Sequence, residues 1–287
     1  SLQAYTAITG RFQHLKTSRI QQLFLFFQFG VSYVLVVFTM VIFSQFKYME
    51  SKETGLNQNQ VLLFNSNNKH SWRNKEFIID ELLKLSSVKD ASMFYGGIPS
   101  SEPETYTYKL DQFSYHWNTA YVQSNLIELL ELKVLDGQSF EQGLARNSEQ
   151  GVLLNERAAS AFGWPQSDLL GKSIRSTEDS TSLIVMGIVE DYHYESFRSE
   201  IEPLVIRSSN WGETFVVKLA TNDYQDALSE IEAIWMNYVP KYPFNYRFLD
   251  ETYQTMHEQE VENGKLIFLF ALLILVITAM VTLSLAG

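Results

Sequence analysis

The stretch Leu23–Phe43, LFLFFQFGVSYVLVVFTMVIF, is 21 residues long and carries no charged side chain. It is the most apolar part of a charge-free run from Ile20 to Phe46, and a second charge-free run extends from Leu266 to Gly287. A helix rises about 1.5 Å per residue, so a run of this length spans roughly 30 Å, the thickness of a bilayer's hydrocarbon core. We therefore predict two transmembrane helices, at residues 20–46 and 264–287.

The charged residues predict which way the chain crosses the membrane. The segment 1–19 contains Arg11, Lys16 and Arg19 and no acidic residue, whereas residues 47–263 hold 18 of the 22 Lys and Arg and all 33 Asp and Glu. Short basic flanks stay in the cytoplasm, and long domains are translocated largely regardless of their charge. We expect a cytoplasmic N-terminal segment at 1–19 and an extracytoplasmic, periplasmic domain with helical stalks at 47–263, held in the inner (plasma) membrane.

Composition limits the chemistry of this outside domain. The chain has no cysteine, which excludes disulfides and thiol chemistry and leaves histidine and carboxylates as the available metal ligands. Its formal net charge of −11 argues against nucleic acid as a partner. A domain of about 215 residues is long enough to bury its own core, as one domain or as two lobes.

Short apolar strands and amphipathic helices interleave through residues 47–263 without a strict βαβ alternation, so the predicted fold class is α+β. Strands are predicted at Val61–Asn65, Val88–Tyr95, Thr105–Leu110, Ser114–Val122, Gly151–Leu154, Ser182–Val189, Pro203–Arg207, Thr214–Leu219 and Asn245–Leu249. Helices are predicted near Lys75–Leu85, Leu126–Leu132, Asn155–Phe162 and Tyr224–Tyr238, with Asn155 and Asp223 as N-caps. A last helix, capped by Asp250, is predicted to run through Glu262 into the second membrane span.

Gly171-Lys172-Ser173 resembles the end of a phosphate-binding P-loop. That motif requires a glycine five residues before Gly171, and the residue there is Gln166. The backbone cradle for phosphate cannot form at this spacing, so a turn before a strand is the better interpretation. We expect no nucleotide binding by this chain alone.

Two acidic clusters are the remaining candidates for chemistry. Asp191-Tyr192-His193, with Glu190 and Glu195, can supply metal-binding or acid–base groups, but no other histidine has ligand spacing with it, so we favour a strand end whose polar residues fix a turn. Glu102 and Glu104 lie on either side of a proline and are either a carboxylate pair or part of a solvated loop. We identify no catalytic, cofactor-binding or metal-ligating residue, and we do not expect an enzyme.

Four segments, in this order along the chain, resemble the MacB/FtsX-type ABC transporter permeases. Ser18–Leu63 resembles their first membrane helix and outside stalk, and GVLLNERAASAFGWPQSDLLGKSI, Gly151–Ile174, resembles their Asn-Glu-x-Ala-Ala…Gly…Gly-Lys segment. VMGIVEDYHYESFRSEIEPLVI, Val185–Ile206, resembles the strand–turn–strand that follows. FNYRFLDETYQTMHEQEVENGKLIFLFALL, Phe244–Leu273, resembles the return stalk and second membrane helix.

This resemblance implies one permease half: a membrane helix, an extracytoplasmic MacB-like periplasmic core and three more membrane helices. The chain is then truncated after its second membrane helix. The resemblance also implies its partners, which are a separate ABC ATPase subunit, a second permease half or homodimer partner, the lipid bilayer and envelope proteins. It implies no cofactor, because ATP is hydrolysed on the partner.

The leading hypothesis is therefore a transmembrane permease subunit that couples cytoplasmic ATP hydrolysis to motion of its extracytoplasmic domain, for export or mechanotransmission. Phe43–Glu53 and Asp250–Leu266 contain no proline, so both can continue the membrane helices outward as levers. The alternative is a membrane sensor or chemoreceptor with an extracytoplasmic ligand-binding domain, which has the same helix–domain–helix order. The two hypotheses differ in what they expect after Gly287, either further membrane helices or a soluble signalling module.

Overall fold

The computed structural model describes residues 19–50, 55–65, 69–99, 101–142, 150–163, 166–195, 200–221, 223–255 and a few helical positions between 269 and 280. The chain divides into two compact units. One comprises Ser1–Ser51 together with Glu258–Gly287, and the other comprises Lys52–His257.

The first unit contains α1 (Arg19–Glu50), a continuous helix of 32 residues. Most of the large apolar side chains that the structure describes in this helix are exposed, with Phe26 80% and Tyr33 72% accessible. Within the part of the chain whose side chains the structure describes, no helix is both long and apolar enough to cross a membrane. The two spans stay a sequence-based prediction.

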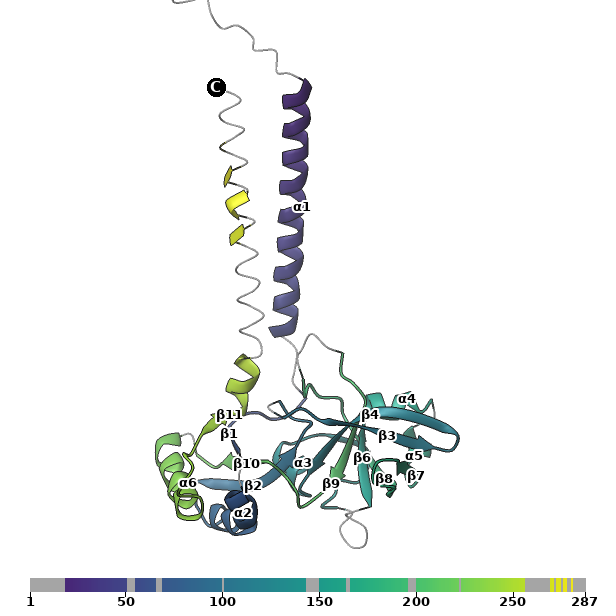
Figure 1. Ribbon diagram of the computed structural model, residues 1–287, viewed down its shortest axis with the longest axis vertical. Helices are drawn as coiled ribbons and strands as arrows, with labels where there is room; N and C mark the ends of the chain where they lie inside the picture. Colours follow the sequence, from purple (N-terminus) through teal and green to yellow (C-terminus); the bar gives the residue numbers. More distant parts are fainter. Residues whose placement is uncertain are drawn as a thin grey trace, which may run out of the picture. The chain divides into compact units, whose positions relative to one another are not determined.

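The two ends of the second unit come together to form the first lobe of its fold. Its strands form a sheet in the order β11-β1-β10-β2, with every neighbouring pair antiparallel. The helix that follows β1 and the helix that follows β10 pack against each other (Figure 1). This is the split β-α-β arrangement of ferredoxin-like folds. The elements are β1 (Val61–Asn65), α2 (Lys69–Leu82), β2 (Val88–Tyr95), β10 (Thr214–Leu219), α6 (Tyr224–Tyr238) and β11 (Tyr246–Phe248).

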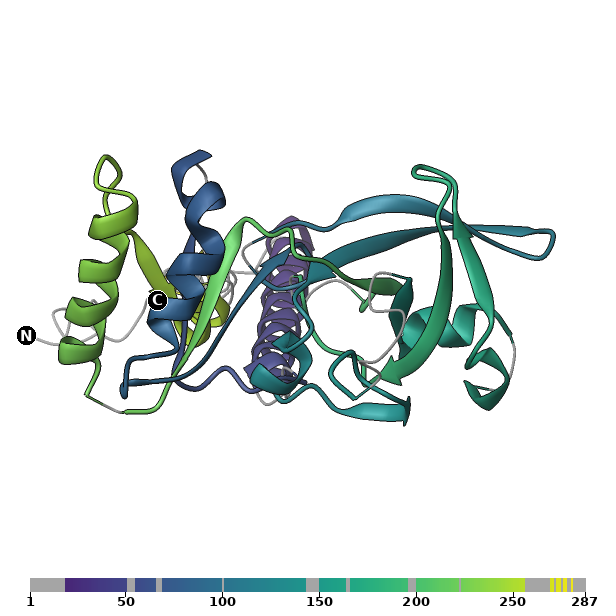
Figure 2. The same ribbon diagram turned by 90° about the horizontal axis from the view of Figure 1, so that it is seen from below.

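The second lobe is inserted between β2 and β10 and contains a closed ring of strands. The order is β4-β3-β7-β8-β6-β9, and the ring closes because β9 pairs with β4 in parallel. A closed ring leaves no free edge for unwanted pairing. Figure 2 shows this ring at the end of the unit away from α2 and α6. The strands are β3 (Glu104–Leu110), β4 (Phe113–Val122), β6 (Gly151–Asn155), β7 (Ser173–Ser176), β8 (Ser182–Val189) and β9 (Leu204–Ser208).

Short elements cover this ring and link it to the first lobe. Strand β5 (Val134–Gly137) pairs with the second half of β8, beyond the residues that pair with β7. The short helices are α3 (Leu126–Leu129), α4 (Glu156–Ala161) and α5 (Gln166–Leu169). The lobes also share strands, because the end of β2 pairs with β4 at Phe94↔Val122 and Tyr95↔Tyr121.

Successive side chains of β1 point to opposite faces of the sheet, and each face packs against a different buried cluster. Leu62 and Phe64 face α2 and α6, whereas Val61 and Leu63 face the opposite side. On that side lies a cluster of buried residues, here called the central cluster, to which both lobes contribute. It contains Val61, Leu63 and Val216 from the first lobe, Ala120, Leu153, Leu204 and Ile206 from the second, and Leu56, Tyr192, Leu249 and Tyr253.

The predicted α+β class is confirmed, and several elements match to the residue. These are the strands Val61–Asn65, Val88–Tyr95, Ser182–Val189 and Thr214–Leu219 and the helix Tyr224–Tyr238. The predicted cap Asn155 is confirmed as well, since its side-chain oxygen accepts the N–H of Ala158 at 2.9 Å. Strands β5 and β7 and the closure of the ring were not predicted.

Of two further predicted helix caps, Asp223 is confirmed in position but not in bonding, and Asp250 is wrong. Asp223 lies at the N-cap position of α6, but its side chain makes no capping hydrogen bond. The last helix of the unit begins at residue 249, so Asp250 is already inside it. The Glu251 carboxylate instead accepts the N–H of Phe248 at 3.3 Å, which is one half of a capping box. The continuation of this predicted helix to Glu262 lies outside the described residues.

Candidate functional site

The segment Asp191–His193 leaves the end of β8, as the sequence predicts, and continues as irregular chain into a bend at Tyr194 and Glu195. We call residues 191–195 the turn after β8. The Asp191 carboxylate accepts the backbone N–H of Arg157 at 3.0 Å, in the first turn of α4. In return the Glu156 carboxylate accepts the backbone N–H of Asp191 at 3.1 Å. These reciprocal bonds tie the turn to the helix.

The acidic residues beside this turn do not gather into a metal site. Glu190 lies 3.7 Å from the Lys133 ammonium, and both side chains are exposed. Burial and then repulsion from Glu202 and Glu102 raise the pKa of the Glu195 carboxyl. Among the described residues, no group of three or more His, Asp or Glu side chains is placed to hold a metal ion.

Tyr192, at the centre of the turn, reaches across to the loop that follows β2. Its buried hydroxyl donates to the backbone carbonyl of Gly97 at 2.9 Å. Gly97 has φ +71°, and a Cβ there would lie 2.5 Å from the Cβ of Ala120, so only glycine lets the loop approach this closely. The turn is therefore fixed to both lobes.

The chain that leaves the domain is anchored at the same turn. In the helix over residues 249–255, Leu249 and Tyr253 are four residues apart and both are buried, so one face of the helix packs into the central cluster. The Tyr253 hydroxyl donates to the backbone carbonyl of His193 at 2.6 Å. Burial raises the pKa of the Tyr253 hydroxyl, which stays a protonated donor throughout the physiological range.

The chain that enters the domain packs against the turn as well. Gly55 has φ +83°, and a Cβ on it would lie 2.8 Å from both the carbonyl oxygen of Asp191 and the Cβ of Tyr192. Leu56 then enters the central cluster. The backbone N–H of Asn57 donates to the carbonyl of Leu130 at 2.9 Å, at the end of α3.

We call Gly55, Leu56, Tyr192, Leu249 and Tyr253 the junction. Three segments far apart in the sequence meet in it, and two of them are the ends of the domain unit. Buried hydrogen bonds and close packing leave little room for one segment to move without the others. Both chain ends are therefore joined to the segment that follows β8 and, through Asp191, to α4 in the ring lobe.

Sequence reasoning identified the turn but missed the junction. The bond between Tyr192 and Gly97 and that between Tyr253 and His193 each join positions more than fifty residues apart. The available clue was the helical spacing of Leu249 and Tyr253, which begins at the last residue of the predicted strand Asn245–Leu249.

The other candidates occupy ordinary structural positions. Gly171 has φ +78° in a turn, and β7 begins two residues later, which confirms the predicted turn before a strand. Glu102 is exposed, as a solvated loop predicts. Glu104 instead begins β3, where its carboxylate accepts the hydroxyl of Tyr106 at 2.8 Å and that of Tyr95 at 3.2 Å.

Comparison with known proteins identifies the fold alone. No family model matches the chain, and no curated protein matches it in sequence. The crystal structure of the periplasmic region of MacB from Actinobacillus actinomycetemcomitans aligns with 73% of this chain and 97% of its own, at 16% identity and a TM-score of 0.52. The extracellular domain of the noncanonic ABC-type transporter YknZ from Gram-positive bacteria aligns with 65% of this chain and 97% of its own, at 14% identity and a TM-score of 0.48. The described domain is thus an α+β domain that resembles the MacB periplasmic region.

Proposed function

We propose that this chain is a transmembrane permease subunit of an ABC transporter, in which the extracytoplasmic domain is moved by ATP hydrolysis on a partner ATPase. The observation that carries the proposal is the junction, where the entering and leaving ends of the domain are held on one turn. The α+β fold shared with the periplasmic region of MacB supports it. The apolar side chains exposed along α1 support membrane insertion of the first helix.

The junction suits a domain that moves as one body. Both lobes contribute to the central cluster, so a force at Tyr253 or Leu56 acts on packed side chains of both sheets. Packed interfaces and rigid elements with buried hydrogen bonds carry such coupling, whereas solvated loops absorb it. The proposed partners are the ABC ATPase, a second permease half or homodimer partner, the bilayer and envelope proteins.

The test measures coupling between ATP hydrolysis and motion of the domain, and it does not require the transported substrate to be known. The full-length protein is purified together with the ATPase that the proposal requires, and the complex is reconstituted in lipid. Hydrogen exchange of residues 190–194 and 249–255 is then compared in ATP and in ADP. We expect ATP to change exchange at the junction, and we expect Tyr253→Ala to abolish that change while ATP hydrolysis continues.

Tyr246→Ala is the matched control, because Tyr246 is a tyrosine of the same lobe that is 44% exposed and outside the junction. It should leave both hydrolysis and the exchange response intact. An assembled complex in which Tyr253→Ala responds to ATP like the wild type would contradict mechanical coupling through the junction. A parent protein that purifies with no ATPase and continues into a soluble signalling module would instead support the sensor.

A further inference from the structure

Lys218 on β10 is a charged side chain buried inside the domain unit. It lies opposite Val61, where the entering chain becomes β1, and its side chain is 6% exposed. Its ammonium nitrogen is shielded from solvent and has no hydrogen-bond partner among the described residues. The carboxylate that pairs with it is that of Glu131, at 4.0 Å. Burial lowers the pKa of Lys218, the Glu131 carboxylate raises it, and Lys89 lowers it further, so Lys218 depends on Glu131 to stay charged.

Glu131 has a backbone conformation that favours glycine. It follows the end of α3 with φ +55°. Its N–H donates to the Glu128 carbonyl at 3.1 Å, and the N–H of Leu132 donates to the Ile127 carbonyl at 2.9 Å, which is the Schellman pattern of helix ends. Glycine is the usual residue at this position, so a glutamate there is strained. Strain of this kind persists where the side chain has a role that glycine cannot fill.

The Glu131 carboxylate joins the entering chain to β10. One oxygen, Oε2, accepts the side-chain amide of Asn57 at 2.9 Å, and the other, Oε1, pairs with Lys218. The backbone N–H of Asn57 also donates to the Leu130 carbonyl, so Asn57 is held twice at the end of α3. The strained glutamate therefore contacts a residue of the entering chain and a buried cation of the sheet at the same time.

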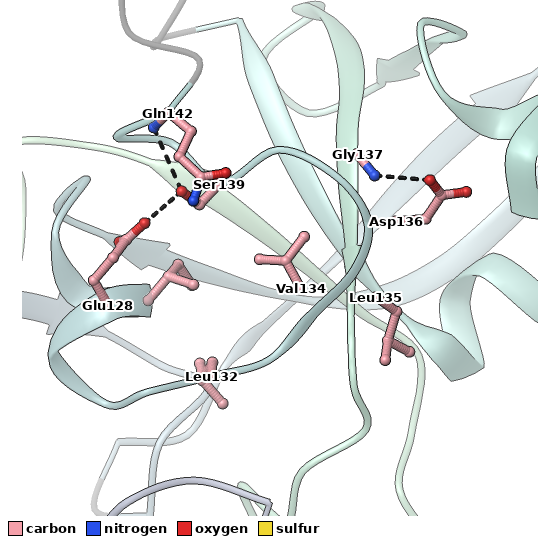
Figure 3. Close-up of a pocket in the computed structure, with 9 residues that line it drawn as sticks. Glu128, Leu132, Val134, Leu135, Asp136, Gly137, Ser139 and Gln142 are labelled. Carbon is pink, nitrogen blue, oxygen red and sulfur yellow. Dashed lines mark hydrogen bonds between the residues drawn. The ribbon is translucent and has the colours of Figure 1, made fainter.

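Helix α3 is a fixed support for this contact. Its apolar side chains are buried in the central cluster, and Asn125 at its start donates its side-chain amide to the Ala91 carbonyl of β2 at 2.9 Å. The Glu128 carboxylate accepts the hydroxyl of Ser139 (Figure 3). The Glu131 side chain, by contrast, is 52% exposed, so water competes for its carboxylate. The weak point of the contact is therefore this carboxylate and not the helix that carries it.

We propose that Glu131 and Lys218 form an electrostatic latch on the chain that enters the domain. While both are charged, the carboxylate stays between Lys218 and Asn57 and holds residues 55–60 against α3. Loss of either charge frees the carboxylate, and residues 55–60 then open locally while β1 and the rest of the domain stay folded. The latch fixes the entering chain whatever force acts on it, so it does not depend on the proposed transport function.

The test compares local opening with global stability in the full chain, reconstituted in lipid nanodiscs. Hydrogen exchange of residues 55–60 at pH 7 measures local opening, and the midpoint of thermal unfolding measures stability. Lys218→Met removes a buried charge that has no hydrogen bond, so the midpoint should stay at the wild-type value or rise. Exchange of residues 55–60 should nevertheless become about tenfold faster, because Glu131 has lost its cation. A lysine that only fills space in the core would change the two measurements in the same direction.

Glu131→Gln removes the other charge. It keeps an oxygen that can accept from Asn57 but leaves Lys218 without a counter-charge, so exchange of residues 55–60 should again be about tenfold faster and the midpoint should fall. Adding Lys218→Met to Glu131→Gln should restore the midpoint without slowing the exchange.

Glu190→Gln is the matched control, because it breaks the exposed pair with Lys133 at 3.7 Å and should change neither measurement. Wild-type exchange of residues 55–60 in Lys218→Met would overturn the latch, as would exchange that rises equally throughout the domain. Neither outcome requires Glu131→Gln to fold.

Discussion

Tyr253 donates its hydroxyl hydrogen to the backbone carbonyl of His193 at 2.6 Å, and this bond ties the chain leaving the domain to the turn after β8. Both ends of the bond are buried, so water cannot replace either partner. The same turn receives Gly55 of the entering chain and is tied to α4 through Asp191. The segment that enters the domain and the segment that leaves it therefore both contact the turn after β8.

Removing the Tyr253 hydroxyl should destabilise the domain measurably. Tyr253→Phe keeps the ring in the central cluster and removes the hydrogen bond to the His193 carbonyl, and the loss of one partner of a buried hydrogen bond costs about 1–3 kcal/mol. Urea denaturation should show a lower midpoint with an unchanged slope. Tyr246→Phe, at an exposed tyrosine, should change the free energy of unfolding by less than about 0.5 kcal/mol. Equal stability of the two variants would show that the bond contributes nothing.

The excised segment 47–263 should fold as a soluble α+β domain. The compact unit Lys52–His257 contains all three clusters of buried apolar residues, and it needs no disulfide. Far-UV circular dichroism and intrinsic tryptophan fluorescence should report one coincident cooperative transition in denaturant. A purified segment that unfolds without a cooperative transition would show that the junction requires the two flanking segments.

Asn155 joins two elements of the ring lobe, and its loss should be costly. Its side-chain oxygen accepts the N–H of Ala158 in α4 and that of Leu204 in β9, and its amide donates to the Glu202 carbonyl at 2.9 Å. Asn155→Ala removes a helix cap and leaves buried groups unpaired, so we expect a loss of about 3 kcal/mol. The exposed Asn59→Ala is the control and should stay near wild type in thermal unfolding. A loss below about 1 kcal/mol in Asn155→Ala would contradict this role.

The ion pair between Arg207 and Asp179 should make stability depend on pH. The Arg207 guanidinium is buried, contacts the Asp179 carboxylate at 2.8 Å and lies 5.3 Å from the Tyr121 ring centroid. Burial alone raises the pKa of Asp179, but hydrogen bonds from the Thr181 N–H and from Arg207 lower it below its usual range. Because the folded pKa lies below the unfolded value of about 3.9, this stabilisation is complete well above pH 4 and is lost as the pH falls below it.

Asp179→Asn should therefore cost about 1–2 kcal/mol at pH 7, a value reduced from that of a fully buried pair because the Asp179 side chain is 38% exposed. The difference from wild type should shrink as the pH falls from about 4 to 2. Glu200→Gln breaks the exposed pair with Arg157 and should cost less than about 0.5 kcal/mol at any pH. A difference between Asp179→Asn and wild type that does not vary with pH would refute this assignment.

Sequence patterns predict an element when they arise from neighbouring residues. They do not predict pairing between strands that lie far apart along the chain. β1 and β10 are short apolar runs between turn residues, and their bounds are predicted to the residue. The parallel pair of β4 with β9, which closes the ring at Asn118↔Leu204, joins strands more than eighty residues apart and has no local signature. Asp250 was predicted as a cap from its residue type, but Glu251 reaches back to Phe248 and the helix starts earlier.

A proline in the helix that leaves the junction should separate ATP hydrolysis from motion of the domain. Gln254 is exposed and lies in the helix over residues 249–255, directly after the buried Tyr253. Gln254→Pro removes a backbone donor and clashes with the carbonyl one turn earlier, which costs about 3 kcal/mol locally and kinks the helix. Gln254→Ala keeps the helix and is the matched control.

In the proposed complex with a partner ATPase, Gln254→Pro should leave ATP hydrolysis near the wild-type rate but abolish the ATP-dependent change in hydrogen exchange at residues 190–194. Gln254→Ala should retain both, because alanine favours the helix and Gln254 is exposed. A complex that assembles with Gln254→Pro and still shows the full exchange response would mean that force reaches the domain by another route. The entering segment, through Gly55 and Asn57, would then be the remaining connection to test.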